Sequence, residues 1–222
     1  MPFSREHTLK YYATDKELAD DIVKAYGMVI NDLYEAGCRN IKLDDWTWEM
    51  MADRSGHLAY GTTQSGLIEI QKAHKDINNK VIANAPKDIV INTHVCRGNF
   101  HSTYANSGAY DPVADILFGE ENVNAYYLEF DDERSGGFEP LAKVSGDKKV
   151  VLGLITTKSP KLENKEEVIK RIHEAEKYIP LDRLYLSPQC GFASCEIGNK
   201  LTEEEQWAKL KLVKEIAKEV WG

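Results

Sequence analysis

KVVLGLIT, residues 149–156, is an almost uninterrupted run of apolar residues between a lysine and a threonine. A run of this kind, without alternating polar residues, is typical of a strand that is buried on both faces. Such strands belong to parallel sheets, because the connections between parallel strands place helices over the sheet. The stretch therefore predicts an inner strand of a parallel α/β sheet.

Strands and helices alternate on both sides of this run. Further strands are predicted at residues 41–45 (IKLDD), 89–96 (IVINTHVC), 125–130 (AYYLEF) and 184–190 (LYLSPQC). Helices are predicted from Thr14 to Gly37, near residues 63–79 and 112–118, and from the capping residues Asn164 and Thr202. Five strands alternating with helices predict a parallel sheet with right-handed crossovers, either a barrel or a doubly wound sheet.

Length and composition indicate one globular domain covering residues 1–222. The net charge of −8 argues against nucleic-acid binding, which needs a clustered excess of lysine and arginine. No apolar run approaches the roughly 20 residues that a membrane span requires, and the first residues do not resemble a signal peptide. We therefore expect a cytoplasmic protein without nucleic-acid or membrane partners, whose four cysteines are reduced and free to bind metal.

Polar residues gather where the predicted strands end. The set comprises Asp44 and Asp45, His94 and Cys96, Glu129 and Asp131, Thr156 to Lys158, and Gln189 with Cys190. In both candidate architectures ligands bind at the carboxyl ends of parallel strands. This edge of the sheet is the expected functional site.

His94 and Cys96 are two residues apart on a strand, so both side chains point to the same face and could hold one metal ion. Cys190 and Glu129 end two further strands, and thiolates combined with imidazole and carboxylate favour zinc. Two other interpretations stay open at this level. His94 and Cys96 could be ordinary buried residues, and Glu129 could be buried only as the ion-pair partner of Arg134.

Three segments, INTHVCRGNF, YYLEFDDERSGG and LSPQCGFAS, resemble the C-terminal catalytic barrel of cobalamin-independent methionine synthase, especially its shorter single-barrel relatives. The resemblance runs from about residue 18 to residue 221. It implies zinc as the cofactor, with His94, Cys96, Glu129 and Cys190 as the ligands. It also implies a (β/α) barrel of the TIM type that is incomplete, with about five of the eight βα units.

The resemblance implies transfer of a methyl group from a methylated folate to the thiol of homocysteine, which forms methionine. Asp44 corresponds to a family aspartate that holds the homocysteine amino group, and Asp45 lies where the family has glutamate. Ser187 and Gln189 are further candidates for substrate binding. Lys158 stands where the larger enzymes carry a histidine thought to protonate the departing folate, so Asp44 and Lys158 are the candidate catalytic residues.

Several alternatives follow from the departures from the family pattern. Lys158 and the missing units are compatible with a catalytically impaired fragment that binds zinc and a thiol. A related thiol alkyltransferase with a corrinoid methyl donor is also compatible. Because an open parallel edge is a liability, a homo-oligomer or a second chain could complete the barrel. Trp46 and Trp48 could stack on a flat donor or simply pack in the core.

Overall fold

The computed structural model describes residues 5–53 and 55–222. All five predicted strands are present and pair in parallel, in the order in which they occur along the chain. They are β1 (Asn40–Asp44), β2 (Val90–Val95), β3 (Ala125–Glu129), β4 (Lys149–Ile155) and β5 (Leu184–Pro188). A sheet in sequence order is the arrangement of barrel units rather than of a doubly wound sheet, in which the strand order reverses.

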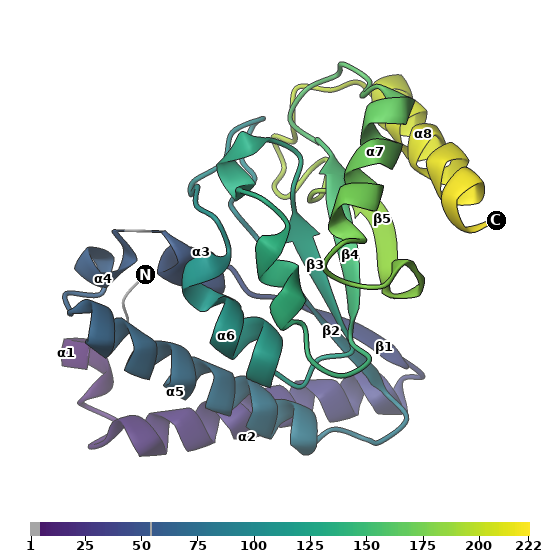
Figure 1. Cartoon of the computed structure of the whole chain (residues 1–222). Helices are drawn as coiled ribbons and strands as arrows, with labels where there is room; N and C mark the ends of the chain where they lie inside the picture. The colour runs from purple at the N-terminus through teal and green to yellow at the C-terminus, as the bar shows by residue number, and fades with distance from the viewer. Residues whose placement is uncertain (1–4, 54) are drawn as a thin grey trace.

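The helices follow the predicted alternation and cover one face of the sheet (Figure 1). They are α1 (Arg5–Thr8), α2 (Asp15–Glu35), α3 (Thr47–Ala52), α4 (Gly56–Ala59), α5 (Gln64–Ala83), α6 (Asp111–Glu120), α7 (Lys165–Ala175) and α8 (Glu203–Trp221). Short 3-10 turns are η1 (Glu133–Ser135), η2 (Glu139–Lys143) and η3 (Leu181–Arg183). Sequence reasoning missed α1, α3 and α4, because helices of one or two turns are too short to reveal a period.

The predicted helix ends are confirmed by their capping contacts. The side chain of Thr14 accepts a hydrogen bond from the backbone of Glu17, whose carboxylate accepts one in return, and Thr202 opens α8 in the same way. Asn164 caps α7. Gly37 follows α2 with a φ of 97°, a left-handed conformation that glycine adopts without steric cost.

The hydrophobic core lies between the sheet and its helices. β4 is buried from Val150 to Ile155, as the opening run of apolar residues predicts. At the edge, β1 alternates, and Asn40, Lys42 and Asp44 are exposed on the face that carries no helices. The chain thus forms about five of the eight units of a barrel, and this face is the part that would be the barrel interior.

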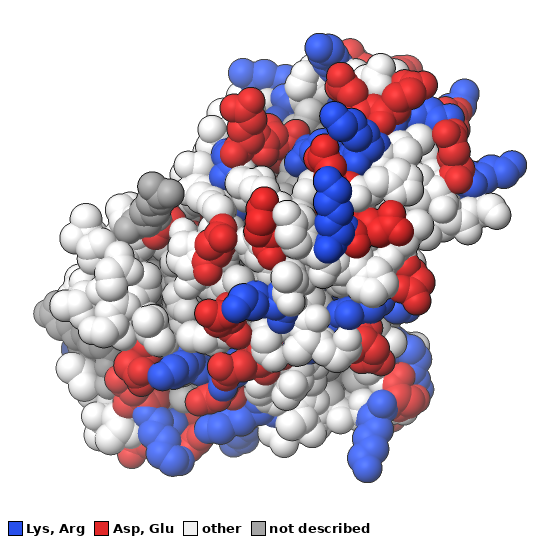
Figure 2. All heavy atoms as spheres, viewed as in Figure 1, with Lys and Arg blue, Asp and Glu red and all other residues white. Residues whose placement is uncertain are grey.

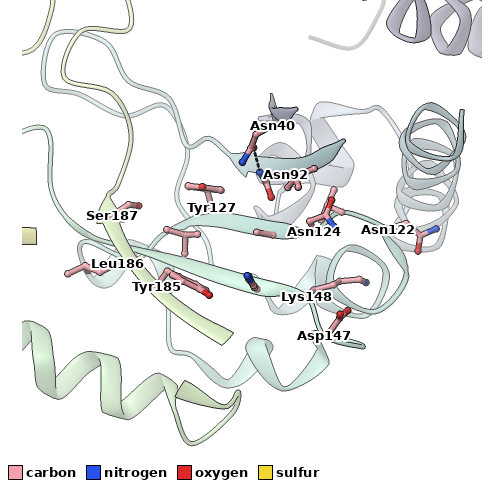
Figure 3. Close-up of a pocket in the computed structure, with 15 residues that line it drawn as sticks. Asn40, Asn92, Asn122, Asn124, Tyr127, Asp147, Lys148, Tyr185, Leu186 and Ser187 are labelled. Atoms are coloured by element: carbon pink, nitrogen blue, oxygen red, sulfur yellow. Dashed lines mark hydrogen bonds between the residues drawn. The ribbon is translucent and has the colours of Figure 1, made fainter. Parts of the chain in front are cut away.

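The open face is hollow. A depression of about 770 Å³ runs along the sheet below the carboxyl ends of its strands (Figure 3). Its lining includes Asn92, Tyr127 and Ser187, and the amide of Asn92 donates a hydrogen bond of 2.8 Å to Asn40. The interior of this partial barrel is therefore accessible from one side.

Several apolar residues of α2 are exposed. Ile30 is 2% exposed, but Val29 and Leu33 on the same helix are 55% and 41% exposed. α2 packs against α5 at the β1 end of the sheet (Figure 1). The contact with α5 therefore buries only part of the apolar surface of α2.

Charged side chains of both signs are interspersed over the helical face (Figure 2). In that view, lysine and arginine are not gathered into one continuous surface. Among the described helices, none combines the length and the apolar character needed to cross a membrane.

Candidate metal centre

Four side chains predicted as metal ligands meet at the carboxyl ends of three strands. His94 lies on β2 and Cys96 just beyond it, Glu129 ends β3, and Cys190 follows β5. One potential ligand atom from each lies within 4.8 Å of the others, and the two sulfur atoms are 4.0 Å apart. Residues that are 96 positions apart in the chain, from 94 to 190, thereby form one compact donor set.

The chemistry of this donor set fits a zinc ion. Nδ1 of His94 lies 3.2 Å from the backbone carbonyl of Tyr127, which assigns the ring proton to Nδ1. Nε2 is buried without a hydrogen-bond partner, so its lone pair is free to bind a metal. One imidazole, two thiolates and one carboxylate form a set that zinc accepts in tetrahedral geometry.

The ionisation of the cluster also favours cation binding. The thiol of Cys96 and the ring of His94 lower the pKa of Cys190 far below the usual range of a thiol, despite burial. The pKa of Cys96 is raised, because its thiol hydrogen-bonds to Cys190 and is buried. Burial opposes protonation of His94, but Cys190 and Glu129 outweigh it and raise the pKa to about 9. The negative charge of the cluster therefore attracts a positive charge, either a proton or a metal ion.

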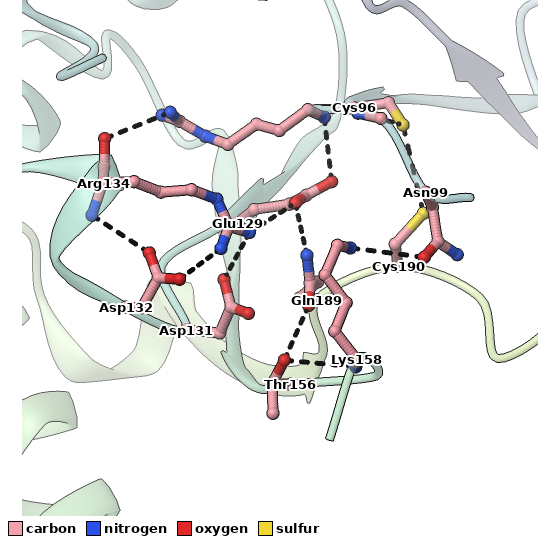
Figure 4. A network of polar contacts seen from close by, with 12 residues as sticks. Cys96, Asn99, Glu129, Asp131, Asp132, Arg134, Thr156, Lys158, Gln189 and Cys190 are labelled. Atoms are coloured by element: carbon pink, nitrogen blue, oxygen red, sulfur yellow. Dashed lines mark hydrogen bonds and ion pairs between the residues drawn. The ribbon is translucent and has the colours of Figure 1, made fainter. Parts of the chain in front are cut away.

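Glu129 has no exposed side-chain surface and is held on both oxygens (Figure 4). Oε1 accepts the backbone N–H of Arg97 at 3.0 Å, while Oε2 accepts Nε2 of Gln189 at 2.7 Å and lies 3.3 Å from Nη2 of Arg134. Burial tends to raise the pKa of this carboxyl, but its contacts with His94, Arg97 and Gln189 hold it below the usual range. Glu129 therefore pairs with Arg134 through Oε2, while its Oε1 lies 3.4 Å from Nε2 of His94 on the side of the donor set.

Asp44 lies at the mouth of the open face, in register with His94 on the neighbouring strand. Its carboxyl is partly buried, which raises its pKa, and the ring of His94 opposes that shift. No hydrogen bond or ion pair of this carboxylate is found among the described residues. The position suits a ligand cation such as an ammonium group.

Asp45 points the other way, into the layer of helices. Its carboxylate accepts hydrogen bonds from Asn78 at 2.9 Å and from the backbone of Thr47, and it lies 2.7 Å from Nε2 of His74. The prediction that Asp45 contacts substrate does not fit this placement. Adjacent residues of a strand face opposite sides, so only one of the two aspartates could reach the open face.

Gln189 is 3% exposed, and its amide is occupied by protein groups. Substrate contact, which the sequence suggested for it, does not fit this environment either. Ser187 lines the hollow of the open face, with its hydroxyl bonded to the backbone carbonyl of Pro188. Because Ser187 lies in this hollow, a substrate would contact it below the donor set.

Lys158 lies on the loop after β4, close to the donor set, and its ammonium group donates a hydrogen bond of 3.2 Å to Asn99. Burial lowers the pKa of this lysine. A lysine with a lowered pKa is a better acid near neutral pH than an exposed one. The structure therefore supplies the desolvation that an acid role for Lys158 requires.

Sequence reasoning missed a pair of asparagines that ties two loops together above the site. Asn99 donates to the carbonyl of Gly191 at 2.6 Å and to Ser194 at 2.7 Å, and Asn199 donates to Asn99 and to the carbonyl of Thr157. These loops follow β2 and β5, which are not neighbours in the sheet. No local pattern reveals such a contact, because it joins residues 100 positions apart.

Of the two tryptophans that could stack on a flat donor or pack in the core, one is buried and the other is exposed. Trp48 is completely buried against His74, with ring centroids 5.1 Å apart, and belongs to the core. Trp46 is 41% exposed. Arg97 is fully buried in an ion pair with Glu49, at 3.0 Å, and its guanidinium is not available to a substrate.

Comparison with known proteins matches residues 10–219 to the family model described as the catalytic domain of cobalamin-independent synthase. The uncharacterized protein YxjG of Bacillus subtilis is 47% identical over 95% of this chain and 56% of its own length. A methionine synthase of Saccharolobus solfataricus is 26% identical over 82% of this chain and 46% of its own length. The chain thus spans about half the length of the curated relatives it matches.

A similar fold is present in a solved structure from Listeria monocytogenes, described as a putative vitamin-B12 independent methionine synthase. It superposes with a TM-score of 0.74 at 34% identity, over 97% of this chain and 62% of that chain. The described strands and helices therefore match less than two thirds of that longer chain.

Proposed function

Because the chain belongs to the family of cobalamin-independent methionine synthase catalytic domains, we propose that it is a zinc-dependent methyltransferase acting on homocysteine. The methyl donor in this proposal is a methylated folate, and the product is methionine. The transfer forms a bond between sulfur and the methyl carbon and breaks the bond between the methyl carbon and a folate nitrogen. The thiol loses one proton, and the folate nitrogen gains one.

The observation that carries the proposal is the convergence of His94, Cys96, Glu129 and Cys190 at the carboxyl ends of three strands. These residues would hold the zinc ion. When bound, zinc would supply the Lewis acidity that keeps a substrate thiol deprotonated near neutral pH. Substrate binding and proton donation would be carried out by side chains of this protein.

Asp44 would bind the ammonium group of homocysteine, since its carboxylate faces the open side next to His94. Lys158 would donate a proton to the departing folate nitrogen. Its buried surroundings support this role, because they lower its pKa towards neutrality. Asn99 holds the ammonium group of Lys158, and so limits where this proton can be delivered.

One specific observation favours alternatives. Lys158 stands where the larger enzymes carry a histidine, which is compatible with a unit that binds zinc and a thiol without completing the reaction. Lys158 in place of a histidine favours a different methyl donor, such as a corrinoid. Both alternatives use the same donor set, but the first involves no methyl transfer and the second takes the methyl group from a donor other than folate.

The test is methionine formation by zinc-loaded protein, supplied with homocysteine and either a methylfolate or methylcobalamin. Product from methylfolate is the expected result. Product from methylcobalamin alone would assign a corrinoid donor. Stoichiometric zinc without product from either donor would reduce the function to binding.

A further inference from the structure

Gln189 lies between the donor set and the loop that follows β4, and its amide orientation is determined by its neighbours. The backbone N–H of Thr157 can only donate, and it lies 3.2 Å from Oε1 of Gln189. The hydroxyl of Thr156 donates to the same oxygen at 3.1 Å. Nε2 must therefore point the other way, where it donates to Oε2 of Glu129 at 2.7 Å (Figure 4).

The two carboxylate oxygens of Glu129 therefore have different surroundings. Oε2 is occupied by the amide of Gln189 and lies 3.3 Å from the guanidinium of Arg134. Oε1 accepts the backbone N–H of Arg97 at 3.0 Å and lies 3.4 Å from Nε2 of His94, on the side of the donor set. The orientation of the carboxylate thus leaves one oxygen facing the place where a metal ion would bind.

We propose that Gln189 is a positioning residue of the metal centre, which holds Glu129 so that a single carboxylate oxygen is presented to the ion. This inference rests on the zinc site of the proposed function. Hydrogen-bond partners of metal ligands fix the orientation of those ligands and thereby strengthen metal binding. Gln189 serves this purpose for Glu129 in the same way that the carbonyl of Tyr127 serves it for His94.

The backbone packing around Gln189 places this residue close to the strand that carries Glu129. A Cβ atom on Gly153 would lie 2.8 Å from the Cα of Gln189 and 2.7 Å from the carbonyl oxygen of Leu128, so only glycine fits between the two strands. The pairing of β4 with β5 shifts at this point. The backbone N–H of Gln189 then donates to the carbonyl of Ile155 at 2.8 Å.

The anchor of Gln189 is itself fixed from the C-terminal helix. The backbone N–H of Thr156 donates to Glu163 at 2.9 Å, and Glu163 pairs with the ammonium group of Lys209 at 3.0 Å. Lys209 lies on α8 and is completely buried. A continuous series of polar contacts therefore leads from α8 through Thr156 and Gln189 to Glu129.

The first test replaces Gln189 by methionine, which is similar in length but cannot form these hydrogen bonds. Zinc affinity is measured by competition with a chromophoric chelator. We expect Gln189→Met to bind zinc about 10- to 100-fold more weakly than the wild type. The matched control is Gln71→Met on α5, which removes another buried glutamine, one that bonds to the carbonyl of Pro112, and should leave zinc affinity unchanged.

A second measurement separates positioning from a general loss of structure. The visible spectrum of the cobalt-loaded protein reports the coordination geometry, and we expect it to change in Gln189→Met but not in Gln71→Met. Thr156→Val, which removes one of the two donors to Oε1 of Gln189, should also weaken zinc binding, but to a smaller extent. The effects of Gln189→Met and Thr156→Val should be less than additive, because both act through one contact.

The outcomes distinguish this inference from the function on which it rests. A wild-type protein that fails to bind zinc would remove the metal site altogether. A wild type that binds zinc, together with a Gln189→Met variant of equal affinity and unchanged cobalt spectrum, would overturn the positioning role alone. If Gln189→Met changed only the KM for the thiol, Gln189 would be a substrate contact instead.

Discussion

Cys96 and Cys190 lie with their sulfur atoms 4.0 Å apart, next to a histidine whose free nitrogen faces the same space. Both cysteines are partly buried. Their value lies in the thiolate, which is the form that binds metal. Cys195, in contrast, is exposed and is not part of the donor set.

Replacement of either Cys96 or Cys190 by serine should abolish tight zinc binding. A serine hydroxyl stays protonated near neutral pH and is a poor ligand, so we expect a loss of affinity beyond the about 100-fold that supporting residues cause. Metal content after dialysis, measured by atomic emission, checks this. Cys195→Ser is the matched control and should retain full zinc content. Unchanged zinc in both ligand variants would show that the site assignment is wrong.

Asp44→Asn should raise the KM for homocysteine about 10- to 100-fold, because a hydrogen bond between charged groups is worth about 1.5 to 3 kcal/mol. The thiol analogue without the amino group, 4-mercaptobutanoate, serves as the control. Wild type and variant should use this analogue equally well. An equal loss with both thiols would mean that Asp44 supports the site in another way.

At the scale of elements, β1 is joined to α5 and α6 by a buried polar cluster. Asn78 on α5 donates to Asp45 and also, at 2.6 Å, to Glu121 at the end of α6. His74 contacts the same aspartate at 2.7 Å. This cluster faces the helices, yet it fixes the strand end from which Asp44 reaches the open face.

Glu121 gives this cluster a pH dependence. The residue is fully buried, and burial raises the pKa of its carboxyl to about 7. Its pKa in the folded protein therefore exceeds its value in the unfolded chain, so the folded state binds the proton more tightly. By linkage, this contribution to stability is present at low pH and is lost as the pH rises through about 7.

We expect Glu121→Gln to remove the part of the loss of stability at rising pH that Glu121 causes. Between pH 5 and pH 8 the free energy of unfolding of the wild type should fall relative to that of the variant by about 2 to 3 kcal/mol. Urea unfolding of both proteins in chelator, so that zinc release does not contribute, measures the difference. Glu120→Gln is the control, because Glu120 is exposed and pairs with Lys75 at the surface. Parallel pH profiles of Glu121→Gln and wild type would contradict the expectation.

At the scale of the whole molecule, the sheet is open on one face and at both edges. The inner surfaces of the strands, with Asn40, Lys42 and Asp44 on β1, are those that further βα units would cover in a closed barrel. Completion by a second copy or by another chain stays a prediction. The donor set itself needs no further unit, since its four residues come from β2, β3, β5 and the residues that directly follow these strands.

Zinc should stabilise the whole partial barrel, because its ligands join three strands and the loops that follow them. At free zinc about 1,000-fold above the dissociation constant, binding adds about 4 kcal/mol to the free energy of unfolding. For a chain of this length, that corresponds to a rise in Tm of about 10 °C. Differential scanning calorimetry with zinc and with chelator measures the shift, and Cys190→Ser should show none. An equal shift in that variant would indicate binding elsewhere.

The sequence by itself determined the order of strands and helices and most of their ends. Apolar periodicity and capping pairs such as Thr14 with Glu17 act within a few residues, so they can be recognised without the fold. The spacing of His94 and Cys96 likewise required them to share one face of a strand. These features depend on residues that are close together in the chain, and the structure contains them.

Only the tertiary structure decided which of two neighbouring aspartates faces the open side of the sheet. Strand alternation required Asp44 and Asp45 to face opposite sides, but the sheet and its helices determined that Asp44 takes the open one. In the same way, the side chain of Gln189 is not available to a substrate, because its amide forms hydrogen bonds with Thr156, Thr157 and Glu129. Such contacts join residues far apart in the chain, and their geometry depends on strand register and packing, which no local pattern encodes.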